Sequence, residues 1–168
     1  MRPTTQTRAL PLSDRRAWMS AALFVAGNIV LPQLCHLVPG GGLTLLPIYF
    51  FTLIGAYKYG AGVGLLTALL SPVANSLLFG MPPAALLPGI LVKSVLLALA
   101  ASYAAARTRR AGIAVLLGVV LAYQTAGSLA ESVMLGSLAE GFQDFRIGVP
   151  GMLLQLFGGW LIINKTAD

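Results

Sequence analysis

Charged side chains are scarce in this chain. Lysine, arginine, aspartate and glutamate make up only 10% of its 168 residues, whereas a soluble domain carries about 25%. So few charges do not cover the surface that a folded chain of this length exposes to water. Hydrophobic residues make up 57% of the chain, and the mean hydropathy is +0.84. The composition therefore excludes an ordinary water-soluble domain and predicts an integral membrane protein.

Cysteine, histidine and acidic residues are also rare, and each shortage excludes a kind of site. A single cysteine, Cys35, rules out a disulfide within the chain, and one cysteine with one histidine, His36, gives no metal-ligand spacing. The sequence contains no plausible Ser–His–Asp set and no glycine-rich phosphate loop. We therefore expect no catalytic residue, no metal site and no cofactor, and we do not expect an enzyme.

Long apolar stretches dominate what the sequence does contain. A bilayer core about 30 Å thick needs about 20 apolar residues per helix. Six stretches meet or approach that length, and the second is short and contains Pro47. The expected spans lie at about 17–38, 43–57, 61–79, 84–106, 111–138 and 147–164. They predict an all-α membrane protein, a compact bundle of six transmembrane helices with no soluble domain.

Basic residues alternate between the turns that join these spans. Four arginines precede the first span, Lys58 follows the second, three arginines follow the fourth and Lys165 follows the sixth. The turns after the first and third spans have none, and the turn after the fifth has only Arg146 beside two acids, so the bias places both termini in the cytoplasm. We therefore divide the chain into a basic cytoplasmic tail (1–16), a transmembrane domain (17–164) and a cytoplasmic C-terminus (165–168). Basic residues at loops and ends also argue against a nucleic-acid partner.

Two charged residues lie inside the expected spans. Lys93 interrupts the apolar stretch "GILVKSVLLALAASYAAARTRR", and Glu131 lies in the outer half of the fifth span. A charge that faces lipid costs at least about 2.5–3.5 kcal/mol, so both side chains should face the bundle interior or a water-filled cavity. One interpretation is a structural ion pair, or a lysine that reaches toward the outer surface. The other is a ligand pocket that opens to the outside.

Other polar residues favour the pocket because several spans each supply one at a similar depth. Gln124, Ser128 and Glu131 share one face of the fifth span. The predicted substrate-binding residues are Lys93, Glu131, Gln124, Gln155, Asn75, Ser128 and Tyr49. The loop "PGGGL" predicts a lid at Gly41 and Gly42, with a simple turn as the alternative. Asn28, in the middle of the first span, is expected to form an interhelical hydrogen bond.

Small residues recur on the first span in "AWMSA" and "ALFVA", which form two consecutive small-x-x-x-small pairs. Residues of this size at this spacing allow a second helix to approach closely. The pairs lie at the expected cytoplasmic end of the span. They predict a partner-docking surface at Ala17, Ala21, Ala22 and Ala26.

The chain resembles the substrate-binding membrane subunits, or S components, of energy-coupling factor transporters, which import vitamins in prokaryotes. The resemblance covers nearly the whole length, and it is carried best by "LPIYFFTLIGAYKYGAGVGLLTALLSPVANSLLFGMPP" and "LLPGILVKSVLLALAASYAAAR". It rests on the proline and aromatic residues of the second span, the turn at Lys58 and Gly60, the pair Ser71-Pro72 and the outer proline turn.

This resemblance implies a function and a set of partners. The implied ligand is a vitamin or related micronutrient, bound in the outer half by Lys93, Gln124, Glu131 and Gln155 beneath a lid at Gly41 and Gly42. The alanines of the first span would dock on a transmembrane scaffold subunit that is joined to two ATPases. The implied location is the plasma (inner) membrane of a prokaryote, with the chain crossing the lipid bilayer several times.

A second class of function stays open at this point. The chain would then be a small multi-span scaffold or assembly protein, in which the alanines form the functional surface and Lys93 and Glu131 form a structural pair. A membrane-embedded enzyme ranks lowest, because catalytic groups are missing. An enclosed outer cavity lined by Lys93, Glu131 and Gln155 would favour transport, and a packed bundle without a cavity would favour the scaffold.

Overall fold

The computed structural model describes residues 9–108 and 111–166, and all regular structure in these two ranges is helical. Four helices are long: α1 (Arg15–Cys35), α4 (Ala61–Phe79), α5 (Leu87–Arg107) and α6 (Ile113–Leu135). Within the described ranges these four are long and apolar enough to cross a membrane. The prediction of an all-α membrane protein is therefore supported.

The prediction of six spans is wrong, because two of the expected spans are short and composite. The segment expected at 43–57 is divided into α2 (Gly41–Leu45), the 3-10 helix η1 (Pro47–Tyr49) and α3 (Phe50–Tyr59). Leu46 separates α2 from η1 with a φ of 46°, in the left-handed region that a leucine rarely adopts. Pro47 follows and cannot donate the next helical hydrogen bond. The apolar run therefore turns where a long helix was expected.

The last expected span is also assembled from short pieces. It contains α9 (Val149–Leu153), the π-helical segment η2 (Leu154–Gly158) and α10 (Gly159–Lys165). Two short helices, α7 (Leu138–Gly141) and α8 (Gln143–Ile147), connect α6 to α9. π-Helical turns are rare and occur frequently at functional sites. Here the π turn carries Gln155, one of the predicted ligand-binding residues.

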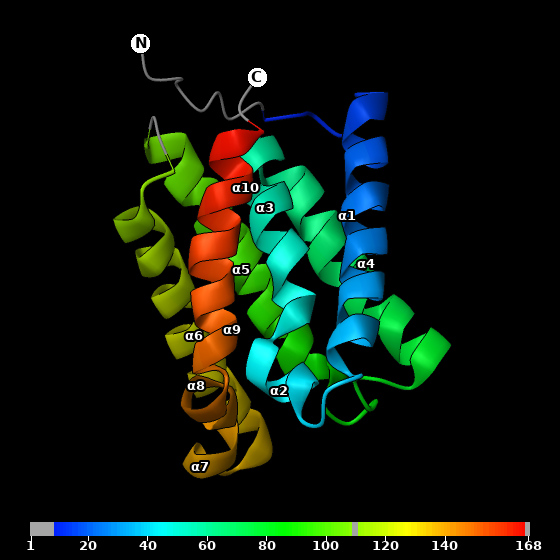
Figure 1. Cartoon of the computed structure of the whole chain (residues 1–168), viewed down its shortest axis with the longest axis vertical. Helices are drawn as coiled ribbons and strands as arrows, with labels where there is room; N and C mark the ends of the chain where they lie inside the picture. Colours follow the sequence, from blue (N-terminus) through cyan, green and yellow to red (C-terminus); the bar gives the residue numbers. More distant parts are fainter. Residues whose placement is uncertain (1–8, 109–110, 167–168) are drawn as a thin grey trace.

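The helices pack around α3, which lies against α1, α4 and α5, and α6 lies beside α5 (Figure 1). The side chains of Leu53, Ala56 and Tyr57 on α3 are completely buried. By contrast, only 28–39% of the most apolar 18-residue stretch of each long helix is buried inside the bundle. Their exposed side chains are nevertheless large and apolar, among them Trp18, Leu23, Leu70, Leu77 and Val133. An apolar exterior around a packed interior matches a protein that is surrounded by lipid.

Figure 1 shows the start of α1 and the end of α10 at one end of the bundle, which we call the terminal end. Lys58 at the end of α3 bonds to the Thr166 carbonyl there at 2.6 Å. The opposite end, called the loop end, carries α2, α7 and α8 (Figure 1). The described parts of the chain nearest its two ends therefore lie at the same end of the bundle.

A polar network fixes α1 against α3 and α4. The Asn28 amide donates to Thr52 at 3.0 Å and to Ser71 at 3.3 Å, and it accepts from the Phe51 backbone N–H at 3.1 Å. Asn28 is completely buried. The predicted interhelical hydrogen bond at Asn28 is confirmed. Satisfied polar contacts of this kind hold helices together where the hydrophobic effect between them is weak.

Candidate functional site

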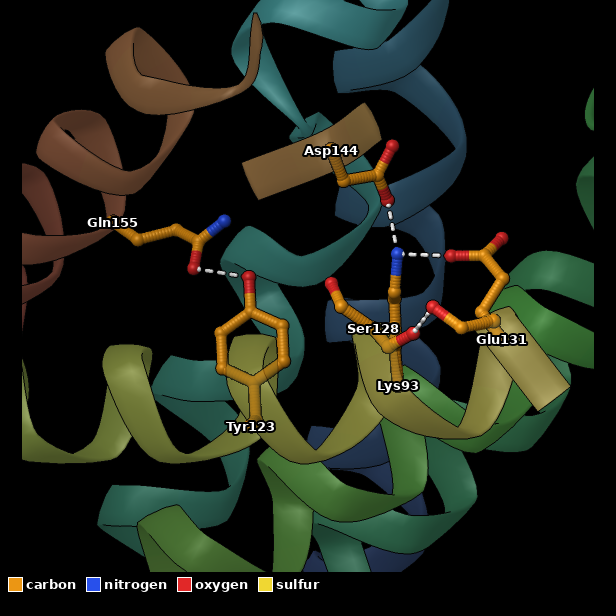
Figure 2. Close-up of polar contacts among 7 residues, drawn as sticks. Lys93, Tyr123, Ser128, Glu131, Asp144 and Gln155 are labelled. Atoms are coloured by element: carbon orange, nitrogen blue, oxygen red, sulfur yellow. Dashed lines mark hydrogen bonds and ion pairs between the residues drawn. The ribbon is translucent and has the colours of Figure 1, made fainter. Parts of the chain in front are cut away.

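The site is centred on Lys93, the seventh residue of α5. Its ammonium group forms ion pairs with Glu131 on α6 and with Asp144 on α8, and the Asp144 oxygen lies 2.7 Å away (Figure 2). Lys93 is completely buried, while the Glu131 and Asp144 side chains keep 13% and 17% of their surface exposed. The lysine is therefore neutralised from both sides, and the two carboxylates are the members that reach outward. The formal charge of this triad is −1.

Two glycines create the space that the triad occupies. A β-carbon at Gly127 on α6 would overlap the alkyl chain of Lys93, and one at Gly89 on α5 would lie 2.9 Å from the Glu131 carboxylate. Each helix therefore has a glycine where the other helix brings a charged side chain across. The sequence pairs Gly89 with Lys93 and Gly127 with Glu131 at a spacing of four, so each pair shares one helix face.

Six buried side-chain atoms have no hydrogen-bond partner among the described residues. They are Tyr49 Oη, Ser94 Oγ, Gln124 Nε2, Gln124 Oε1, Ser128 Oγ and Gln155 Nε2. A buried polar group without a partner costs about 1–3 kcal/mol, so a bundle designed only for packing would avoid such a cluster. A bound polar molecule would supply the missing partners.

Tyr123 joins these groups to one another. Its hydroxyl donates to Gln155 Oε1 at 2.8 Å, and its ring centroid lies 5.5 Å from that of Tyr49. Figure 2 shows Tyr123, Ser128 and Lys93 projecting in the same direction, toward the side from which Asp144 and Gln155 approach. The polar groups of η1, α5, α6, α8 and η2 thus converge.

A pocket of about 110 Å³ opens at the loop end above this cluster, and we call it the acidic pocket. Tyr49, Glu131, Glu140, Gln143 and Asp144 supply its polar lining. None of the described residues that line it is a lysine, arginine or histidine. The pocket therefore presents three carboxylates, of which two are bound to the buried ammonium of Lys93.

A second pocket of about 320 Å³ lies next to the first, and we call it the apolar pocket. Prolines and large apolar side chains dominate its lining, with His36 as the one titratable group among the described lining residues. The residues that line both pockets are Gly42, Leu43, Ile48, Leu86 and Ile90. The two hollows are therefore adjacent, and residues of α2 and of the start of α5 border both.

Six of the seven predicted substrate-binding residues belong to this region. Lys93, Gln124, Ser128, Gln155 and Tyr49 are buried, and Glu131 is half-buried in contact with Lys93. The placement of the seventh residue, Asn75, is a correction. Its amide donates to the Asn28 carbonyl at 2.8 Å and to the Ser71 carbonyl at 3.0 Å. It belongs to the α1–α4 network, because its helix face turns toward α1.

The predicted lid lies beside the pockets, whereas half of the predicted docking surface is buried. Gly41 and Gly42 form the first turn of α2 rather than an open loop, and Gly42 lines both pockets. On α1, Ala17 and Ala21 are buried against the chain's own helices, with 0% and 2% exposure. They are therefore not available to a partner, and this part of the docking prediction is corrected. Ala22 and Ala26 are exposed.

Sequence reasoning did not place Asp144, Tyr123 or Ser94 at the site. The sequence does offer a reason to consider Asp144. It is one of only five acidic residues, and it lies in the loop between the last two expected spans. Tyr123 and Ser94 each precede or follow a predicted site residue, Gln124 and Lys93, and only the helix rotation shows that they also face inward. No group of three or more His, Cys, Asp or Glu side chains in 9–108 and 111–166 is placed to hold a metal ion.

Comparisons of the chain with protein-family models, with curated proteins and with solved structures found no match in any of the three. The class of protein therefore follows from its own helices and site. The four long apolar helices indicate a multi-pass, all-α membrane protein. Its interior contains a charged triad, a cluster of unpartnered polar groups and two adjoining pockets at the loop end.

Proposed function

We propose that the chain is a substrate-binding membrane subunit that captures a small, vitamin-like solute for import. A separate scaffold subunit and two ATPases would supply the energy, since the sequence contains no phosphate-binding loop. The observation that carries this proposal is the group of six buried side-chain N and O atoms, from Tyr49, Ser94, Gln124, Ser128 and Gln155, that have no hydrogen-bond partner among the described residues. Such a cluster destabilises an empty bundle and is stabilised by a ligand that forms the missing hydrogen bonds.

The proposal also assigns an orientation and a route. The loop end would face the outside of a prokaryotic plasma membrane, because the basic ends of α3, α5 and α10 gather near the other side. The solute would enter through the acidic and apolar pockets, with α2 as the lid. The exposed Ala22 and Ala26 would form the surface on which the scaffold subunit docks.

A scaffold or assembly protein is the second candidate, and the direct contact between Lys93 and Glu131 favours it. In that case the triad would only hold α5, α6 and α8 together. The adjoining pockets and the unpartnered groups distinguish the candidates, because a purely structural bundle gains nothing from them. Both candidates predict the same membrane-embedded fold.

Mass spectrometry of small molecules that co-purify with the full chain tests the proposal. We expect one compound to be recovered in near-stoichiometric amount from the wild type and to be lost from Gln124→Leu. Gly118→Ala serves as a matched control on the same helix, since a β-carbon there meets no described atom within 4 Å. Recovery of no compound from well-folded wild-type protein, together with unchanged cell uptake of vitamins on deletion, would favour the scaffold.

A further inference from the structure

The charge of the acidic pocket restricts the solute that it can hold. Glu131, Glu140 and Asp144 line it, and Lys93 is completely buried below. Arg146 lines a neighbouring hollow together with Glu140 and Gln143, and it does not line the acidic pocket. Lys93 already binds two carboxylates, so it has little positive field left for an anionic ligand. An anion that enters the pocket would meet the exposed edges of the carboxylates first. A cation would meet opposite charge.

Tyr49 gives an independent indication of a ligand at the same place. It lines the acidic pocket, is 1% exposed, and its hydroxyl has no hydrogen-bond partner among the described residues. Its ring also lies against that of Tyr123, so an electron-rich aromatic pair borders the acidic groups. Aromatic faces attract ammonium and other organic cations, most strongly where water is excluded.

The apolar pocket provides room for the rest of such a molecule. It shares Ile48, Leu86 and Ile90 with the acidic pocket, and its volume of about 320 Å³ is the larger of the two. Pro32, Pro47 and Pro82 form part of its wall. Prolines and large aliphatic side chains offer no charge partner, so the pocket suits an apolar ring or chain.

We infer that the solute is a small organic cation with an apolar body. Its protonated or quaternary nitrogen lies in the acidic pocket near Glu131 and Asp144, and its apolar body lies in the apolar pocket beneath α2. This inference rests on the proposed function, which requires only some bound solute, and adds the chemical class of that solute. It also changes the expected role of Lys93, which positions the two carboxylates and does not itself bind an anionic group.

Three probes of nearly equal size test the charge preference. They are 2-phenylethylamine, the neutral 2-phenylethanol and the anionic 3-phenylpropanoate, each titrated by calorimetry into the full chain in lipid nanodiscs at pH 7. We expect the amine to bind at least about tenfold more tightly than either of the others. Equal or tighter binding of the anion or the alcohol, or no binding of the amine, would overturn the inference. Methylammonium, which lacks the apolar body, should bind more weakly than 2-phenylethylamine, and equal affinities would overturn the assignment of the apolar pocket.

Glu131→Gln removes one charge from the pocket and keeps the shape of the side chain. We expect it to weaken binding of the amine by about tenfold or more. Asp14→Asn is the matched control, because it makes the same change of charge at the N-cap of α1, and asparagine caps a helix as well as aspartate. Unchanged affinity in Glu131→Gln, or an equal loss in Asp14→Asn, would contradict the inference.

The inference and the proposed function can fail separately. If an anionic or neutral compound co-purifies with the wild type, the proposed function stands, but the inference that the solute is a cation is overturned. Absence of any co-purifying compound, with no binding of the three probes, would overturn both.

Discussion

Lys93 on α5 lies directly across Gly127 on α6, and its alkyl chain occupies the space that a β-carbon at position 127 would need. This contact lets the ammonium group reach Glu131, one helical turn further along α6, and Asp144 on α8. The charged triad therefore depends on an absent side chain as much as on the three that are present. The same contact gives a direct way to disturb the site.

Gly127→Ala should displace Lys93 and weaken ligand binding. The added methyl group must push the lysine chain away or separate α5 from α6, and such overpacking costs about 1–3 kcal/mol. Gly118→Ala, on the same helix with open space around it, should leave the midpoint of thermal unfolding unchanged or slightly raised, because alanine favours a helix. Comparison of the two midpoints and of the ligand recovered from each variant checks this. Equal behaviour of the variants would count against the contact.

Lys93→Ala should destabilise the protein in addition to affecting binding. Removal of one member of a buried ion pair costs about 3–5 kcal/mol, because the remaining charge is left uncompensated. The triple variant Lys93→Met, Glu131→Gln, Asp144→Asn should recover most of that loss, since it removes all three charges together. Thermal unfolding in the same detergent measures both. A single variant as stable as the wild type would show that the triad is hydrated and not buried.

Gln124→Leu should make the ligand-free protein more stable while abolishing ligand binding. Both polar atoms of the Gln124 amide are buried without a partner, so a leucine of similar size removes an unfavourable term of about 1–3 kcal/mol. Tyr123→Phe is the contrasting change, because it removes a hydroxyl that is bonded to Gln155 and should lower stability by about 1 kcal/mol. Opposite shifts of the two unfolding midpoints are expected, and shifts of the same sign would contradict the prediction.

Ala22→Trp should abolish uptake in cells and leave ligand binding by the purified subunit intact. The position is exposed on α1, so a tryptophan there is accommodated by lipid but prevents a second helix from approaching closely. Ala126→Trp is the control at an exposed position on α6. Normal uptake by Ala22→Trp, or an equal loss in Ala126→Trp, would remove α1 as the docking surface.

Asn28→Ala should weaken the packing of α1 without touching the pocket. The substitution leaves the Phe51 N–H without its acceptor and removes the hydrogen bonds to Thr52 and Ser71. We therefore expect the free energy of unfolding to fall by about 1–3 kcal/mol. Gln33→Ala, which removes a long contact of 3.5 Å from the Gln33 amide to the Asn75 side chain, should lower stability much less. At a temperature where both variants are folded, they should bind ligand like the wild type.

The sequence predicted that Lys93 and Glu131 face the interior, because burial of charge in an apolar stretch has few solutions. Lys93 and Glu131 had to face inward, and helical spacing placed Gln124 and Ser128 on the face of Glu131. Asp144 was not predicted to belong to the site, because it lies between two expected spans, where an acidic residue ordinarily faces water. Asn75 was assigned to the site on depth alone. Depth is fixed by position along a helix, whereas the neighbour that a side chain meets is fixed by the rotation of the helix.

The amino-acid sequence by itself determined the class of this protein and its long helices, because a chain with so few charges and such long apolar runs is stable only when its backbone bonds to itself in an apolar surrounding. The tertiary structure decided the rest. It showed that the apolar runs at 43–57 and 147–164 are composite, that half of the alanines on α1 face inward, and that Lys93 is shared by two carboxylates. These outcomes depend on how helices rotate and where loops fold back, and such relations join residues far apart in the chain.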